Sequence, residues 1–572
     1  MPLRKPSSLF PLISLLLAAA CGDGGGDAPA PDAGDVCPAT AVVSAVQAAD
    51  RKILGAGAAY AADGALRGRD DALAGSQKLR REAAWQVVAR VLAPVDLAYP
   101  FPSAPTLAAQ LPRFQTWYAK DDLSRMFERL YAGLGAEGRA ARAPFGEGAL
   151  DEAFTWNVTS VDELANWPAE RWNAYLAAVD TPEKAAGVGG IARVGYSPAA
   201  ARHLVDGYPE LLKCLAGGAP PRFVDGPAAG TQRLAREPLA LGACTERVYG
   251  PYFVAGGETL HARAADGAIT VRAAGQPGDV RCHAVAGDAC DVPGGAAFEI
   301  VVTAGTHGAH GMLEVDYTAP DVPWAACLPA AFPADAVVVK ADWRRVLPDM
   351  PLAVYDTSAA GLARRLSDDG AFAWGDGDGV ADPGSGDIYT ATLANGNTYR
   401  LAALHIMTKE LDHWVWVTLW WSPTETAGAD FGADRPAAIT ALGGPWAHYK
   451  MCTTTAFEER DAAADGGFGA SAPTLGAALA VVHSRVSWCS NPYLELGPGN
   501  ADTNCLGCHQ HAGTKLLAED ILADPVLFPV HGRVEVRNNF PSDYSWTVDH
   551  GDELSRMFAD VVEYWDTGAA GP

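Results

Sequence analysis

The sequence lacks several features that would assign it to a common functional class. It carries 43 basic residues against 68 acidic ones, a net charge of −25, and no run of basic residues. Such a surface repels nucleic acid and anionic lipid, and it favours solubility or a basic partner. No nucleophilic triad or phosphate-binding glycine loop stands out, and short glycine clusters such as Gly189-Gly190 are weak signals. We therefore expect no nucleic-acid partner.

The apolar run at the N-terminus is too short to span a membrane. Arg4 and Lys5 precede an apolar stretch from Leu9 to Leu17, and three alanines then lead to Cys21. This order of charged, apolar and small residues predicts a secretory signal over residues 1–20. A cysteine directly after small residues resembles the bacterial lipoprotein signal, in which Cys21 becomes the lipidated first residue of the mature chain. The alternative is an ordinary signal cleaved nearby, with Cys21 incidental.

Residues 21–40 are rich in Gly, Pro, Ala and Asp, and they predict a flexible tether with nothing to bury. By resemblance to Gram-negative lipoproteins, the absence of Asp directly after Cys21 indicates an outer-membrane lipoprotein that faces the periplasm or the cell surface. We expect contact with the membrane only through this lipid anchor.

Cysteine and histidine combine in one specific motif, Cys505-Leu506-Gly507-Cys508-His509. Two thiols separated by two residues can form thioethers with the two vinyl groups of one haem, and the following histidine is directed at the iron. With 11 Cys and 13 His in 572 residues, random placement gives this pattern only about 0.005 times per chain. The motif predicts covalent haem c, attached at Cys505 and Cys508, with His509 as the proximal iron ligand.

Two other sites use similar spacing. Zinc could be held by Cys505, Cys508 and His509 or His511, and a Cys-x-x-Cys pair can also be a redox dithiol. A structural zinc site needs four ligands, however, and the chain has no second Cys-x-x-Cys. Haem attachment takes place outside the cytoplasm, so the motif and the export signal support one another.

The other cysteines are even in number and predict disulfides in an oxidising compartment. Two pairs are close in the chain and are our candidates, Cys282 with Cys290 and Cys452 with Cys489. The full set is Cys37, Cys214, Cys244, Cys282, Cys290, Cys327, Cys452 and Cys489.

Sequence periodicity predicts a multidomain α+β fold. Residues 41–216 have helical patterns, with the clearest apolar face between Asp121 and Leu134. Residues 240–320 hold short β-rich runs separated by turns and predict a small β-sandwich. Residues 336–460 predict a mixed α/β region with aromatic strands, including a hairpin at Asn395-Gly396. Residues 461–572 predict a loop-rich haem-attachment segment that ends in an amphipathic helix from Asp552 to Trp565.

An acidic stretch suggests a further ion site. Asp376, Asp378, Asp382 and Asp387 offer oxygen ligands at spacings like those of calcium loops. The stretch lacks a ligand at the fifth position and a glycine at the sixth. Calcium and a flexible acidic turn are the two interpretations.

The region before the haem motif carries a family resemblance. It contains His405-Ile406-Met407-Thr408-Lys409, Trp414-Val415-Trp416-Val417-Thr418 and Gly497-Pro498-Gly499-Asn500-Ala501. With these segments the chain resembles an uncharacterised family of exported bacterial monohaem cytochrome c-like lipoproteins, similar to myxobacterial proteins. The resemblance covers mainly residues 336–565 and implies one covalent haem. The chain differs from small soluble cytochromes c in its length, its β insertion and its lack of an obvious distal methionine motif.

Four residues are candidates for the sixth iron ligand: His405, His511, Met407 and Met557. We favour His405 because strand alternation puts it on the same face as Met407, beside a tryptophan-rich strand. His511 lies only two residues beyond the proximal ligand, which fits a propionate or surface contact better.

We expect electron transfer or redox sensing with a redox partner protein of unknown identity. One alternative is a peroxidase-like haem oxidoreductase with an open sixth position under His405 or Lys409. Another is a binding protein whose β domain docks a partner while the haem is structural.

Overall fold

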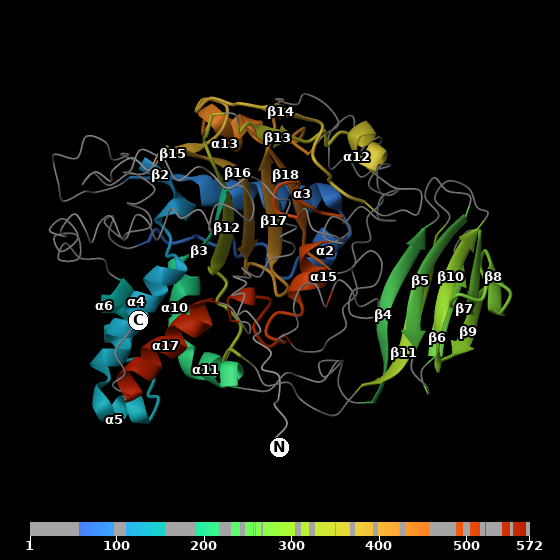
Figure 1. Ribbon diagram of the computed structural model, residues 1–572, viewed down its shortest axis with the longest axis horizontal. Coiled ribbons are helices and arrows are strands. Elements are labelled where there is room, and N and C mark those ends of the chain that lie inside the picture. The colour runs from blue at the N-terminus through green and yellow to red at the C-terminus, as the bar shows by residue number, and fades with distance from the viewer. Residues whose placement is uncertain are drawn as a thin grey trace, which may run out of the picture.

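The structure is a computed structural model that describes 19 stretches of the chain. They are residues 57–96, 110–154, 190–216, 230–240, 246–254, 257, 259–264, 267–303, 310–319, 327–348, 350–365, 372–392, 398–423, 431–456, 488–495, 504–514, 521, 540–548 and 553–567. The fold is mixed α+β with several antiparallel sheets (Figure 1). The predicted signal, Cys21 and the tether lie outside the described residues.

A six-stranded sheet forms the centre of the molecule. Its strands run in the order β18-β17-β16-β12-β3, and β15 also pairs with β16. All neighbouring strands are antiparallel. The strands are β3 (Gly190–Tyr196), β12 (Val337–Arg345), β15 (Thr390–Thr392), β16 (Thr398–Thr408), β17 (Val415–Trp421) and β18 (Tyr449–Thr454). The predicted pairing of the hairpin strands, β15 with β16, and the predicted tryptophan-rich strand are confirmed, while the turn at Asn395-Gly396 lies outside the described residues.

Both faces of this sheet are covered. On one face, Val415, Val417 and Leu419 pack with helix α3 (Gln77–Leu92) in a first hydrophobic core. On the other face, Met407 and Trp416 belong to a second core that also contains helix residues. Its helices are α4 (Lys120–Gly133), α6 (Glu147–Phe154), α10 (Pro198–Asp206), α11 (Tyr208–Ala216) and α17 (Glu553–Thr567). Because apolar neighbours occupy both faces, β17 is buried at every position.

The N-terminal helices do not have a core separate from the rest of the chain. Helix α3 shares the first core with the central sheet, and α4 and α10 share the second core with α17 near the C-terminus. Phe127 of α4 stacks on Phe558 of α17 with ring centroids 4.3 Å apart. Residues 41–216 also supply β3 to the sheet. A boundary at residue 216 therefore does not separate two cores.

The predicted β-sandwich is present and begins about ten residues earlier, at β4 (Figure 1). Two four-stranded sheets, β5-β10-β7-β8 and β4-β11-β6-β9, enclose one apolar core. Cys282 of β8 and Cys290 of β9 form the predicted disulfide, which joins the two sheets. The strands are β4 (Gly230–Ala240), β5 (Glu246–Val254), β6 (Thr259–Ala264), β7 (Ala268–Ala273), β8 (Val280–Val285), β9 (Ala289–Pro293), β10 (Ala296–Thr303) and β11 (His310–Ala319).

Shorter elements complete the fold. They are α2 (Asp70–Ala74), β1 (Pro94–Asp96), β2 (Gln110–Pro112), η1 (Arg113–Thr116), α5 (Gly135–Ala140), β13 (Leu352–Val354), α12 (Ala359–Arg365), β14 (Gly379–Ala381), α13 (Ala437–Thr440), η2 (Gly444–His448), α15 (Cys505–His509) and η4 (Trp546–Val548). Among the described residues, no helix is both long and apolar enough to cross a membrane.

Candidate functional site

The five-residue motif forms a single helical turn, α15. Asn504 caps it, since its side chain accepts a hydrogen bond from Gly507 N at 3.1 Å. Positions three and four apart lie on the same side of a helix, so Cys505, Cys508 and His509 are neighbours on one side of the turn. Both cysteines are buried. This arrangement suits two thioethers and one iron ligand from the same short segment.

A hydrogen bond from Nδ1, the ring nitrogen that would not bind the iron, orients His509. His509 Nδ1 lies 2.9 Å from the backbone carbonyl oxygen of Tyr544. A carbonyl only accepts, so Nδ1 carries the hydrogen and Nε2 keeps its lone pair for a metal. Burial lowers the pKa of His509 to about 4, which keeps the ring in the neutral form that binds iron. The ring also lies against Trp416, with centroids 4.5 Å apart.

The central sheet presents two rows of paired residues to this helix turn. Directly paired residues of antiparallel strands lie on the same face, and successive pairs on that face are two positions apart. One row is Tyr196, Val338, Met407, Trp416 and Thr454. The next is Val194, Lys340, His405, Thr418 and Cys452. The strand register therefore confirms the prediction that His405 and Met407 lie on the same face of the sheet.

One pocket is lined by both candidate iron ligands. His405 and His509 lie in its wall together with Met407, Cys505 and Trp416. The pocket holds about 840 Å³ of empty space, its open mouth included. Val194, Val338 and Ile406 add apolar wall, Lys120 and Lys340 add ammonium groups, and Glu495 adds a carboxyl group. An apolar pocket with a few convergent polar groups is typical of a cofactor site.

A buried nitrogen atom in this pocket fits a metal ligand. His405 Nε2 is buried and has no hydrogen-bond partner among the described residues. Burial lowers the pKa of His405 to about 3, helped by the nearby Lys340 ammonium and by the neighbouring His509, which disfavours a second protonated ring, so His405 is neutral. Leaving a buried ring nitrogen unpaired is unfavourable, and binding to iron would satisfy it. The residues present therefore fit a haem between His509 and His405.

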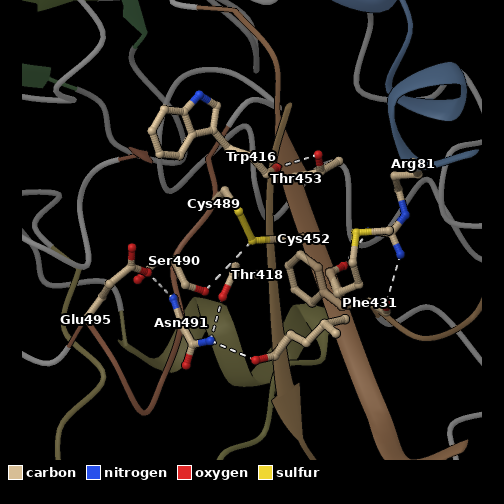
Figure 2. Close-up of a disulfide and its surroundings, with 12 residues drawn as sticks. Arg81, Trp416, Thr418, Phe431, Cys452, Thr453, Cys489, Ser490, Asn491 and Glu495 are labelled. Atoms are coloured by element: carbon tan, nitrogen blue, oxygen red, sulfur yellow. Dashed lines mark hydrogen bonds between the residues drawn. A yellow bond between two sulfur atoms is a disulfide. The ribbon is translucent and has the colours of Figure 1, made fainter. Parts of the chain in front are cut away.

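The second predicted disulfide supports one wall of the pocket. Cys452 and Cys489 are bonded, as predicted, with Cα atoms 5.6 Å apart (Figure 2). Just after Cys489, Asn491 Nδ2 donates to Thr418 Oγ1 at 2.6 Å and to the carbonyl of Leu419 at 3.0 Å. Asn491 N in turn donates to Glu495, which lines the pocket. The bond thus ties Glu495 to the same row of the sheet as His405. Cys327 is also disulfide-bonded, while Cys37 and Cys244 lie outside the described residues.

Three other candidate side chains lie elsewhere. His511 is 1% exposed, so it is not on the surface, and neither it nor Met557 is among the described residues that line the pocket. Lys409 does not reach the pocket either, because its Nζ lies 2.7 Å from Asp543 Oδ1. The structure therefore brings together His509, His405 and Met407, and leaves the other candidates aside.

The four aspartates of the acidic stretch are not gathered into one cluster. Asp378 pairs with Arg365, Asp382 pairs with Arg400 at 2.5 Å, and Asp387 lies 3.9 Å from His448. Asp376 is exposed. Within the part of the chain that the structure describes, no group of three or more His, Cys, Asp or Glu side chains is placed to hold a metal ion. The arrangement fits an acidic turn paired with arginines. Around Cys505 and Cys508, the residues that the structure describes form no four-ligand zinc set.

Sequence reasoning missed Tyr544, Lys340, Glu495 and Trp546. Lys340 could have been found by aligning β12 with β16, which pairs it with His405. Trp546 Nε1 is a second buried nitrogen in the pocket without a partner among the described residues. The other two are brought to the site by loops without a sequence pattern.

Comparison of the chain with protein-family models, with curated proteins and with solved structures found no significant match. The arguments for function therefore come from the motif and from the geometry around it.

Proposed function

We propose that this protein is an exported, lipid-anchored c-type cytochrome that binds one covalent haem and transfers electrons or senses redox state. Cys505 and Cys508 would attach the haem, and His509 would be the proximal ligand. When bound, the haem supplies a one-electron ferric/ferrous couple. The observation that carries the proposal is the pocket that holds the oriented ring of His509 and the buried Nε2 of His405, which has no hydrogen-bond partner among the described residues.

His405 is the sixth ligand that the geometry supports best. It is neutral, and no side chain or backbone group in the described stretches satisfies its Nε2. Met407 occupies the adjacent row and is 8% exposed, so it is positioned to pack against the haem. Two imidazole ligands leave no open position for peroxide, which favours electron transfer over the peroxidase-like alternative. The redox partner would present a basic surface, because the chain carries a net charge of −25.

Covalent haem is tested by maturing the protein in a host that exports it and attaches haem c. A pyridine haemochrome assay on the denatured protein should find one haem that stays with the chain. Cys505→Ala and Cys508→Ala should each weaken attachment, since one thioether is lost, whereas Cys282→Ala should leave it intact. A haem-free protein that holds zinc would overturn the proposal.

The anchor needs a separate test. Palmitate labelling should tag the wild type and miss Cys21→Ser, which should move to the soluble fraction. Equal labelling of both proteins would show that Cys21 is not lipidated.

A further inference from the structure

A strained backbone cluster lies directly behind the proposed proximal ligand. Of the four non-glycine residues with positive φ in the described part of the chain, three belong to it: Trp414 at 66°, Asp543 at 46° and Tyr544 at 69°. L residues with side chains rarely adopt this conformation, and it persists only where surrounding contacts hold it. Tyr544 is the residue whose carbonyl accepts the hydrogen bond from His509.

The contacts that hold this backbone converge on Asp543. Its carboxylate accepts from Lys409 Nζ at 2.7 Å and from Phe332 N at 2.8 Å. Its carbonyl accepts from Trp414 Nε1 at 3.0 Å. Lys409 also donates to the carbonyl of Asp412 at 2.5 Å. These donors fix the Asp543–Tyr544 peptide. The next peptide carries the Tyr544 carbonyl, and its Ser545 N donates to the carbonyl of Ser542 at 3.0 Å. Together these contacts hold the turn that directs the Tyr544 carbonyl at His509.

The hairpin of β16 and β17 therefore contributes residues to both sides of the site. Strand β16 carries His405, and the loop that leaves it carries Lys409 and Trp414, which hold the Tyr544 turn. Lys409 and Asp543 are 7% and 8% exposed. Charges buried this deeply are weakly screened, so any imbalance between them acts on a nearby redox centre.

We propose that Lys409 and Asp543 form a positioning pair that orients His509 through Tyr544 and whose balanced charge sets the reduction potential of the iron. The inference rests on the proposed function. An unpaired cation near the iron disfavours the more positive ferric state, so removing the anion alone should raise the potential. Removing both charges should bring it back.

The test is the midpoint potential of matured Asp543→Asn and of the double variant Lys409→Met/Asp543→Asn. Asparagine tolerates positive φ and keeps one acceptor oxygen for Phe332 N, while its NH2 group replaces the oxygen that faces Lys409. The turn keeps one of its two side-chain hydrogen bonds and the charge is lost. Asp543→Asn should shift the ferric/ferrous ratio at fixed potential roughly tenfold toward ferrous, which is about 59 mV for one electron. The double variant should return toward the wild-type potential, which a merely structural role would not predict.

A control is the ion pair of buried Arg81, on helix α3 on the opposite face of the sheet, with Asp434, whose side chain is 21% exposed; the paired atoms lie 2.6 Å apart. Asp434→Asn should lower stability and leave the potential unchanged. If Asp543→Asn does not fold, Trp414→Phe keeps an aromatic ring and removes the indole donor to the Asp543 carbonyl, together with its longer 3.4 Å contact to Asp543 Oδ1. It should raise the potential by a smaller shift and alter the ferric EPR signal, because the Tyr544 hydrogen bond to His509 weakens.

The outcomes separate the two proposals. A wild type without covalent haem overturns the proposed function and this inference with it. Haem-loaded Asp543→Asn with an unchanged potential overturns the inference alone, and so does a double variant shifted as far as the single one.

Discussion

The β-sandwich and the central sheet are both antiparallel, but they differ in how much of each strand is buried. Strand β6 of the sandwich alternates between buried and partly exposed positions, whereas β17 of the central sheet is buried throughout. In the sandwich each sheet has one face toward solvent, so its polar residues need no special explanation. In the central sheet, the polar row of Lys340, His405 and Thr418 lies among buried strand positions: Thr418 is buried, and Lys340 and His405 are partly exposed where they line the pocket. Polar groups there are costly to desolvate, so this face is our candidate for function.

The two disulfides with both partners described, one in each region, give the largest expected difference between them. The double variant Cys452→Ala/Cys489→Ala removes a disulfide whose cysteines are 37 residues apart. The lost constraint on the unfolded chain should lower the free energy of unfolding by about 4 kcal/mol. The double variant Cys282→Ala/Cys290→Ala removes a disulfide whose cysteines are 8 residues apart, and its free energy of unfolding should fall by about 2.5 kcal/mol. Residues 230–320 contain no tryptophan, so tryptophan fluorescence during denaturant unfolding reports only on the rest of the chain.

We therefore expect the first double variant to lower the fluorescence midpoint and to change the haem spectrum, because Asn491 and Glu495 lose their support. The second should weaken the sandwich, seen by circular dichroism, while the fluorescence midpoint and the haem spectrum stay the same. A haem spectrum that responds to both variants would contradict the separation of the two regions.

The sequence predicted the elements whose pattern is local. The hairpin of β15 and β16, the tryptophan strand β17, the sandwich and both tested disulfides follow from short-range periodicity or spacing. The contacts that complete the site depend on packing between distant segments. Tyr544 meets His509 from 35 residues away and Lys409 meets Asp543 across 134 residues, and no local pattern encodes either meeting. For that reason sequence reasoning considered Lys409 for the wrong side of the site.

A buried carboxyl should give the central region a distinctive pH dependence. Burial raises the pKa of Glu495 from 4.5 to about 8, although hydrogen bonds from Asn491 and Ser490 oppose the shift. Between about pH 4.5 and 8 the folded protein therefore binds one more proton than the unfolded chain. Stability falls as pH rises through that window, and the difference between the two pKa values limits the fall to a few kcal/mol, roughly. In Glu495→Gln the free energy of unfolding should depend less on pH in this window. An unchanged slope in fluorescence-monitored unfolding would refute the assignment.

The sandwich should show the opposite and smaller dependence. Hydrogen bonds from Gly275 N and Arg272 lower the pKa of Glu299, whose side chain is about one-fifth exposed. Its contribution is present above the ordinary carboxyl pKa and is lost as pH falls below it, and for such a surface pair it is below about 1 kcal/mol. Glu299→Gln should reduce the acid sensitivity of the circular dichroism transition only slightly. A large loss of stability at neutral pH would contradict this account.

The most direct test of the central claim is the ferric EPR spectrum of matured His405→Ala beside those of Met407→Ala and His511→Ala. The account predicts a low-spin, six-coordinate wild type, a change to high spin in His405→Ala, and low-spin spectra in the other two variants. A low-spin His405→Ala together with a high-spin Met407→Ala or His511→Ala would contradict the pairing of His509 with His405.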